Sequence, residues 1–150
     1  MLSEKIVEYC RSDVRDVRGF DRCQFVSADR GRFEVKAFPG PDCENNVGTV
    51  HGGFMLVLVD MVGSGVADTF GYENVTMSMA TSFLRPAWVT DEYLRVVGTA
   101  LHAGKRTTVV EVEISRPSGE VVLKSTVTMA MFPNRPIDPP AAPPAASEKE

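Results

Sequence analysis

One carboxylate stands alone in an apolar stretch of the 150-residue chain. Asp60 is the only formal charge between Asn45 and Ala67. Burying a carboxylate raises its pKa and costs free energy unless hydrogen-bond donors or a wet cleft compensate, so such a residue usually has a purpose. Asp60 is therefore a candidate general base or nucleophile. The alternatives are a paired core carboxylate or one at a subunit interface.

A second candidate element lies eight residues earlier, where two glycines open the apolar run. Backbone N–H groups at a helix start, together with the positive end of the helix dipole, can hold an oxyanion. Glycines also let a ligand approach the backbone closely. This loop and helix start contribute Asn45, His51, Gly52 and Gly53 as candidate site residues. The alternative is a turn that merely requires glycine geometry.

The spacing of these two elements points to more than one chain. Gly52 and Asp60 are separated by about 12 Å of rise along one helix, which is too far for a single carbonyl group to touch both. If both act on one carbon atom, they come from different subunits, and a two-fold dimer with paired helices would supply two composite sites. Ser64, one turn after Asp60, either holds the carboxylate or a water, or is simply a small packing residue.

Basic side chains are concentrated between residues 85 and 106, although the formal net charge of the chain is −4. The segment holds four basic and two acidic side chains: Arg85, Arg95, Lys105, Arg106, Asp91 and Glu92. Phosphate groups would fit such a segment. The alternative is a solvated strand edge protected by its charges.

The elements that must position these residues follow from hydrophobic periodicity and turn signals. We expect an α+β architecture, in which an antiparallel sheet packs against one long buried helix. The expected helix spans residues 51–70, after a short amphipathic helix at 3–11. The expected strands are Arg32–Phe38, Val75–Arg85, Tyr93–His102, Thr107–Ser115 and Val121–Phe132.

Length and composition favour one domain with short flanks. We expect an N-terminal helix and lead-in over residues 1–29, a core domain over 30–132, and a disordered tail rich in proline and alanine over 133–150.

Composition also narrows the function classes. The acidic balance argues against general nucleic-acid binding. Three widely spaced cysteines and two histidines argue against a disulfide framework or a metal site, and no cofactor motif is present. Because no signal segment and no bilayer-length apolar run is found, we expect a cytoplasmic protein without membrane insertion.

Three motifs in a fixed order give the chain a family resemblance. They are N-x-x-G-T-V-H-G-G-x6-D over residues 45–60, S-F-L-R-P-A over 82–87 and L-H-x-G-K-R over 101–106. Together they resemble the hotdog-fold acyl-CoA thioesterases, and most closely the phenylacetate-degradation (PaaI-like) type of the thioesterase superfamily. The match covers roughly residues 30–132.

The resemblance implies a sheet of five to six antiparallel strands wrapped around the central helix, in dimers that often pair into tetramers. It implies that Asp60 is the catalytic carboxylate, that Asn45 positions the thioester or water, and that Gly52 is an oxyanion donor from the partner subunit. Ser64 matches a hydroxyl that orients the nucleophile. Residues in or beside the matched motifs that we expect to contact substrate are Gly53, Thr76, Arg85, Gly104, Lys105 and Arg106.

The expected activity is hydrolysis of an acyl-CoA thioester to a free acid and CoA. A thiol departs without a strong general acid, so one carboxylate and an oxyanion hole meet the main needs. The alternatives are a non-catalytic acyl-CoA-binding hotdog domain and a hydroxyacyl-thioester dehydratase. Residues 77–80 read Met-Ser-Met-Ala, whereas relatives commonly carry an acid and an amide there, which bears on acyl specificity.

Overall fold

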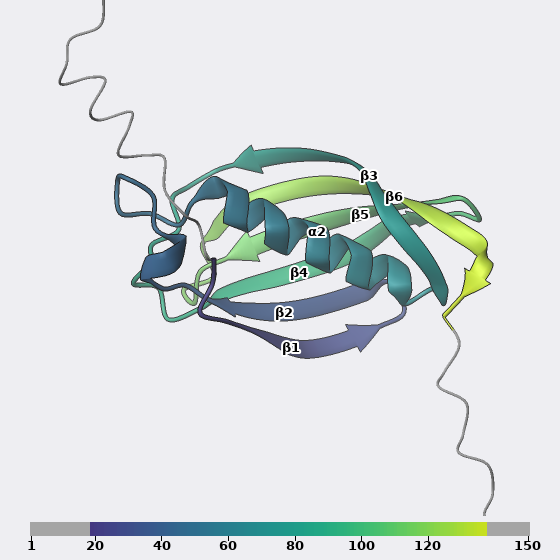
Figure 1. Cartoon of the computed structure of the whole chain (residues 1–150), viewed down its shortest axis with the longest axis horizontal. Coiled ribbons are helices and arrows are strands. Elements are labelled where there is room, and N and C mark those ends of the chain that lie inside the picture. Colours follow the sequence, from purple (N-terminus) through teal and green to yellow (C-terminus); the bar gives the residue numbers. More distant parts are fainter. Residues whose placement is uncertain (1–18, 138–150) are drawn as a thin grey trace, which may run out of the picture.

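Six antiparallel strands and one long helix make up residues 19–137, the part of the chain that the computed structural model describes. The sheet has the order β1-β2-β4-β5-β6-β3, and α2 lies across one face of it (Figure 1). The elements are β1 (Arg22–Asp29), β2 (Arg32–Phe38), the 3-10 helix η1 (Pro41–Cys43), α2 (Gly52–Asp68), β3 (Tyr72–Phe83), β4 (Leu94–Ala103), β5 (Thr107–Ser115) and β6 (Val121–Pro136).

Alternation along the central strands creates the core. In β5 the buried residues Thr108, Val110, Val112 and Ile114 alternate with more exposed ones, because successive side chains of a strand point to opposite faces. The apolar face packs against Leu58, Val59, Val62 and Val66 of α2, all fully buried. One face of the sheet therefore holds the helix, and the other carries charged ladders.

Glycines let α2 lie close to the sheet. A Cβ atom at Gly98 of β4 would lie 2.6 Å from Val66 Cγ2 and 2.7 Å from Val62 Cγ1. A Cβ at Gly65 would meet the ring of Phe33 at 2.8 Å. Since real Cβ atoms do not approach so closely, any larger residue at either position would force a neighbouring side chain or the helix to shift.

The helix and the four strands after it match the sequence expectation within a few residues at each end. One expectation was wrong: residues 22–29, assigned to the lead-in, form β1 and pair with β2 in the same sheet. β1 lacks an apolar alternation because it is an edge strand and mostly exposed. In addition, β6 continues past Phe132 to Pro136. The expected helix at 3–11 and residues 138–150 of the expected tail lie outside the described residues.

The second edge strand, β3, leaves an apolar surface uncovered. Among residues 19–137, β3 pairs only with β6, so its other edge carries backbone groups that no described strand pairs with. Five exposed apolar side chains on β3 and the adjacent flank of α2 form what we name the β3 face: Val57, Met61, Met77, Met79 and Phe83. Isolated proteins rarely leave several large apolar side chains of one region open to water. Within residues 19–137, no helix has the length and apolar character needed to cross a bilayer.

Candidate active site

The start of α2 presents a free backbone donor. His51 is the N-cap, and its Nδ1 atom accepts a hydrogen bond of 3.1 Å from the Gly53 amide. The His51 amide in turn donates to the Cys43 carbonyl at 2.7 Å. The Gly52 N–H lies between these two and has no hydrogen-bond partner within residues 19–137. A free N–H at the positive end of a helix dipole is suited to bind an oxyanion.

The loop before α2 is organised by one amide side chain. Asn45 Oδ1 accepts hydrogen bonds from the Val47 amide at 3.1 Å and from the Thr49 amide at 3.0 Å. Its Nδ2 atom donates to Thr49 Oγ1 at 2.8 Å. Because an amide nitrogen carries two hydrogens, one donor of Asn45 remains for a ligand. Thr49, which the sequence analysis did not single out, therefore helps to orient Asn45.

A cleft of about 370 Å³ joins these residues. It brings together three predicted site residues, Asn45, Gly52 and Arg85, from the loop, the helix start and the segment after β3. The rest of its wall is largely apolar: Val50, Met55, Phe83, Leu84, Pro86 and Ala87, with Thr49 beside Asn45. The cleft combines a free N–H, an amide and a guanidinium, which are donors that can bind an oxyanion or a phosphate group.

Asp60 lies elsewhere, and its surroundings differ from the sequence expectation. We expected a buried carboxylate, but Asp60 is exposed. The reason is tertiary: the flank of α2 that carries Asp60 faces the edge strand β3, beyond which no element of the described chain packs. Thr76 Oγ1 of β3 donates a hydrogen bond of 2.5 Å to Asp60 Oδ1, which fixes the orientation of the carboxylate. Asp60 is not part of the wall of the cleft.

Ser64 takes part in a separate chain of hydrogen bonds. Its hydroxyl donates to Asn74 Oδ1 at 2.9 Å, and Asn74 Nδ2 donates to Asp68 Oδ1 at 2.6 Å. Desolvation raises the pKa of the Asp68 carboxyl, while the bond from Asn74 lowers it. Ser64 thus contacts Asn74 rather than Asp60. Asn74 and Thr76 are two residues apart on one strand, and that spacing is the signal that places both beside α2.

The basic residues do not form one group within a single chain. Arg85 follows the Phe83 end of β3, and Lys105 and Arg106 lie in the β4–β5 turn near its Tyr72 end. The 12 residues of β3 separate these ends by about 36 Å. Arg95 is bound on the outer face of the sheet by Glu34, at 2.7 and 2.9 Å.

A second cavity of about 460 Å³ adjoins the β4–β5 turn. Its wall includes Gly104 and Lys105 from the turn, together with Arg30, Phe70, Tyr72, Ala103, Met131 and Pro133. There is little room for a side chain at Gly104, because a Cβ atom would lie 2.9 Å from His102 Nε2. Within residues 19–137, no three His, Cys, Asp or Glu side chains are grouped so that they could hold a metal ion.

Solved structures with the same architecture include CoA-bound proteins. A protein of Streptococcus mutans UA159 solved with acetyl-CoA is 27% identical, with a TM-score of 0.72 over 79% of this chain and 95% of that one. A hypothetical thioesterase of Streptococcus pneumoniae TIGR4 solved with coenzyme A is 25% identical, with a TM-score of 0.75 over 79% and 94%. The PaaI protein of Escherichia coli, from the phenylacetic acid degradation operon, shares the fold at 24% identity, with a TM-score of 0.71 over 73% and 79%.

Comparison with family models gives the assignment. A search of curated proteins finds no match to this chain. The model of the thioesterase superfamily matches residues 47–123, which is more than half of the chain and runs from the loop before α2 into β6. The predicted hotdog architecture and the predicted family are both confirmed, and the chain belongs to the thioesterase superfamily.

Proposed function

We propose that the protein hydrolyses an acyl-CoA thioester to a free acid and CoA. The observation that carries this proposal is the presence of two features that hydrolysis requires. One is the unpartnered Gly52 N–H in the wall of a cleft, and the other is the Asp60 carboxylate, oriented by Thr76. Both lie within the segment that matches the thioesterase superfamily.

The chemistry divides between these two groups. The Gly52 N–H binds the thioester oxygen as it becomes negative, which stabilises the tetrahedral transition state. Asp60 either removes a proton from the attacking water or attacks the carbonyl carbon to form an anhydride, and Thr76 holds it in place for both. The thiol of CoA has a pKa of about 8.5, so it departs as a thiolate without a strong general acid.

The active species in this proposal is at least a dimer. Within one chain, Gly52 lies beside Phe83 and Asp60 lies beside Thr76, so the two groups are at different heights along β3. A two-fold axis near Met79 would pair the free edges of two β3 strands antiparallel and bring Thr76 opposite the partner's Phe83. Asp60 would then approach the partner's Gly52. The same pairing would cover the exposed side chains of the β3 face.

That symmetry also gives the basic residues a shared role. Antiparallel pairing of β3 brings the Phe83 end of one strand to the Tyr72 end of the other. Arg85 would therefore approach the partner's Lys105, although the two are far apart within one chain. We propose that Arg85, Lys105 and Arg106 bind CoA phosphates in this composite arrangement, with Gly53 and Gly104 keeping the backbone open to substrate.

A thiol-release assay with a panel of short, medium, long and aryl acyl-CoAs tests the function. Turnover of at least one acyl-CoA by the wild type, lost in Asp60→Asn, is the expected result. CoA binding without turnover of any panel member would instead indicate a non-catalytic acyl-CoA-binding domain. Hydration of an enoyl-CoA, which is the reverse of dehydration and is measured as the loss of its ultraviolet absorbance, would indicate a dehydratase. Light scattering at the assay concentration distinguishes monomer, dimer and tetramer, and a fully active monomer would contradict the composite site.

A further inference from the structure

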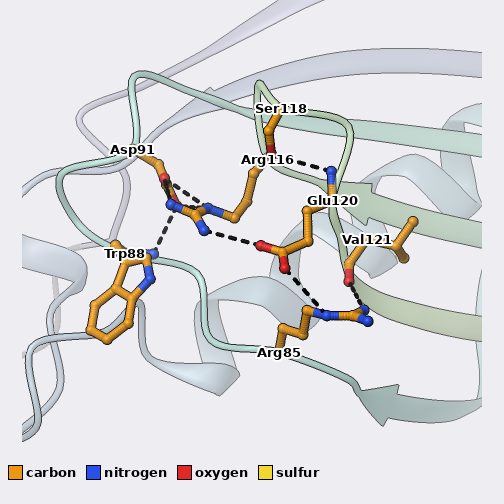
Figure 2. Close-up of polar contacts among 7 residues, drawn as sticks. All are labelled: Arg85, Trp88, Asp91, Arg116, Ser118, Glu120 and Val121. Atoms are coloured by element: carbon orange, nitrogen blue, oxygen red, sulfur yellow. Dashed lines mark hydrogen bonds and ion pairs between the residues drawn. The ribbon is translucent and has the colours of Figure 1, made fainter.

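A chain of ion pairs connects the β5–β6 hairpin to the rim of the cleft that contains Gly52 (Figure 2). Arg116 holds Asp91 in a two-pronged contact, with Nη2 at 2.7 Å and Nε at 2.9 Å from Oδ1. The same guanidinium reaches Glu120 Oε2 through Nη1 at 3.0 Å. Glu120 Oε1 then lies 3.3 Å from Arg85 Nε. Glu120 is thus shared by two arginines, one on the hairpin and one at the cleft.

The exposure of the side chains in this series of ion pairs increases from Asp91 to Arg85. The side chain of Asp91 is 6% exposed, Arg116 29%, Glu120 40% and Arg85 52%. Hydrogen bonds from Arg116 to both carboxylates raise its pKa above the usual value, so it stays charged. The buried end is further fixed because the Trp88 amide donates to Asp91 Oδ2 at 2.8 Å. The rigid end therefore lies at Asp91, in the segment between β3 and β4, and the open end lies at Arg85, at the cleft.

The contacts of Arg85 use only part of its guanidinium. Of its five N–H donors, Nε faces Glu120 and Nη1 donates to the Val121 carbonyl at 3.0 Å. The Nη2 group has no partner within residues 19–137. Arg85 also lines the cleft that contains Gly52 and Asn45. The guanidinium is anchored on one side and available to an anion on the other.

We propose that Glu120, supported by Arg116, is a positioning residue that holds Arg85 at the cleft rim to bind a phosphate of the acyl-CoA carrier. This inference rests on the proposed function and adds residues outside the three sequence motifs. A purely structural role would differ, since the network would then only tie residues 84–91 to the hairpin and would affect every substrate alike.

The kinetic test compares two substrates with the same thioester, an acyl-CoA and the corresponding acyl-pantetheine, which lacks all phosphates. In Glu120→Ala we expect KM for acyl-CoA to rise about 3- to 5-fold, the upper part of the range of one exposed ion pair, with kcat unchanged. KM for acyl-pantetheine should not change. Removing Glu120 also makes the rim more positive, which by itself would lower KM for an anion, so a rise reports lost positioning.

Two further variants sharpen the result. Glu120→Gln keeps an oxygen acceptor for Arg85 and should restore most of the affinity for acyl-CoA. Arg85→Ala should raise KM for acyl-CoA at least as much as Glu120→Ala, and the double variant should show no further rise. Glu113→Ala is the matched control, because it breaks the Glu113–Lys124 pair of 3.2 Å on the outer face of the sheet, away from the cleft. Its KM for acyl-CoA should equal that of the wild type.

Three outcomes would overturn the inference: an unchanged or lower KM for acyl-CoA in Glu120→Ala, an equal rise for both substrates, or an additive double variant. Failure of the proposed function would look different, because the wild type would then turn over neither substrate. In that case, calorimetric binding of CoA to the wild type and to Glu120→Ala still tests the positioning. We expect the affinity of Glu120→Ala for CoA to be lower by about 3- to 5-fold.

Discussion

The two flanks of α2 are built in opposite ways. On one flank, Val62 and Val66 of the helix are fully buried and leave no room for a Cβ atom at Gly98 of β4. On the other flank, toward β3, Val57 and Met77 are 54% and 61% exposed, and the carboxylate of Asp60 lies among them. The same helix is thus fully buried on one side and exposes apolar side chains on the other. We propose that a second molecule covers the open flank, which includes the candidate catalytic residue Asp60.

The largest expected effect comes from a substitution that removes the proposed catalytic group of the open flank and leaves the packing there intact. Asp60→Asn should lower kcat for acyl-CoA by roughly 100-fold or more, because the base or nucleophile is lost. The melting temperature should change little, since the carboxylate is exposed and an amide oxygen can still accept from Thr76. Kinetics and thermal melting on the same preparation check this.

Asp68→Asn, at the other carboxylate of α2, is the matched control for that variant. It should retain wild-type kcat. A near-normal kcat in Asp60→Asn, with a lowered melting temperature, would mark Asp60 as a structural carboxylate and end the catalytic assignment.

A charge placed on the β3 face should separate assembly from folding. Met79→Lys puts an ammonium group into the proposed interface, at a cost above about 1.4 kcal/mol, the equivalent of tenfold in association. We expect a folded monomer by light scattering and circular dichroism, with activity reduced by about tenfold or more. Ser78→Lys, on the opposite face of the same strand, should leave the assembly intact. A dimeric and active Met79→Lys would show that the open flank is not the interface.

The closed flank should respond in stability alone. Gly98→Ala adds a Cβ atom within 2.7 Å of two valine side chains, so these side chains or the helix must shift away from the sheet. We expect a loss of about 1–3 kcal/mol in the free energy of unfolding. Urea denaturation measures it, and Thr99→Ala, at the exposed neighbouring position, is the control. An unchanged midpoint would mean that the helix–sheet contact is looser than these distances indicate.

The smallest expected effect concerns the outer face of the sheet, away from both flanks. Hydrogen bonds from Arg95 and Arg32 lower the pKa of the buried Glu34 from its usual value of 4.5. A carboxyl whose pKa is lower in the folded state than in the unfolded state stabilises the fold at pH values above its unfolded-state pKa. That contribution is lost as the pH falls through the folded-state pKa. The stability gap between the wild type and Glu34→Gln should thus narrow between pH 7 and the acid range. A gap independent of pH in urea denaturation would contradict it.

How far the sequence alone could be interpreted differs from element to element. The helix at 52–68 and strands β2, β4, β5 and β6 carry strong apolar patterns because each has buried residues, and they were predicted with small errors at their ends. β3 has no buried residue, but its exposed apolar side chains gave it the same signal. β1 was missed because an edge strand with mostly exposed side chains needs no apolar alternation. Periodicity reports burial, so it cannot detect an element that is held mainly by backbone pairing.

Local order in the sequence was enough to identify the helix start and the motifs around Asn45, Gly52 and Asp60, since their types and spacing are properties of one short segment. Only the tertiary structure decided what those residues touch. It exposed Asp60 beside Thr76, turned Ser64 toward Asn74, and joined Arg85 to Glu120, a partner 35 positions away in the chain. The physical reason is that exposure and ion pairing depend on which strand lies at the edge and which hairpin folds back, and these are contacts between segments that no local pattern encodes.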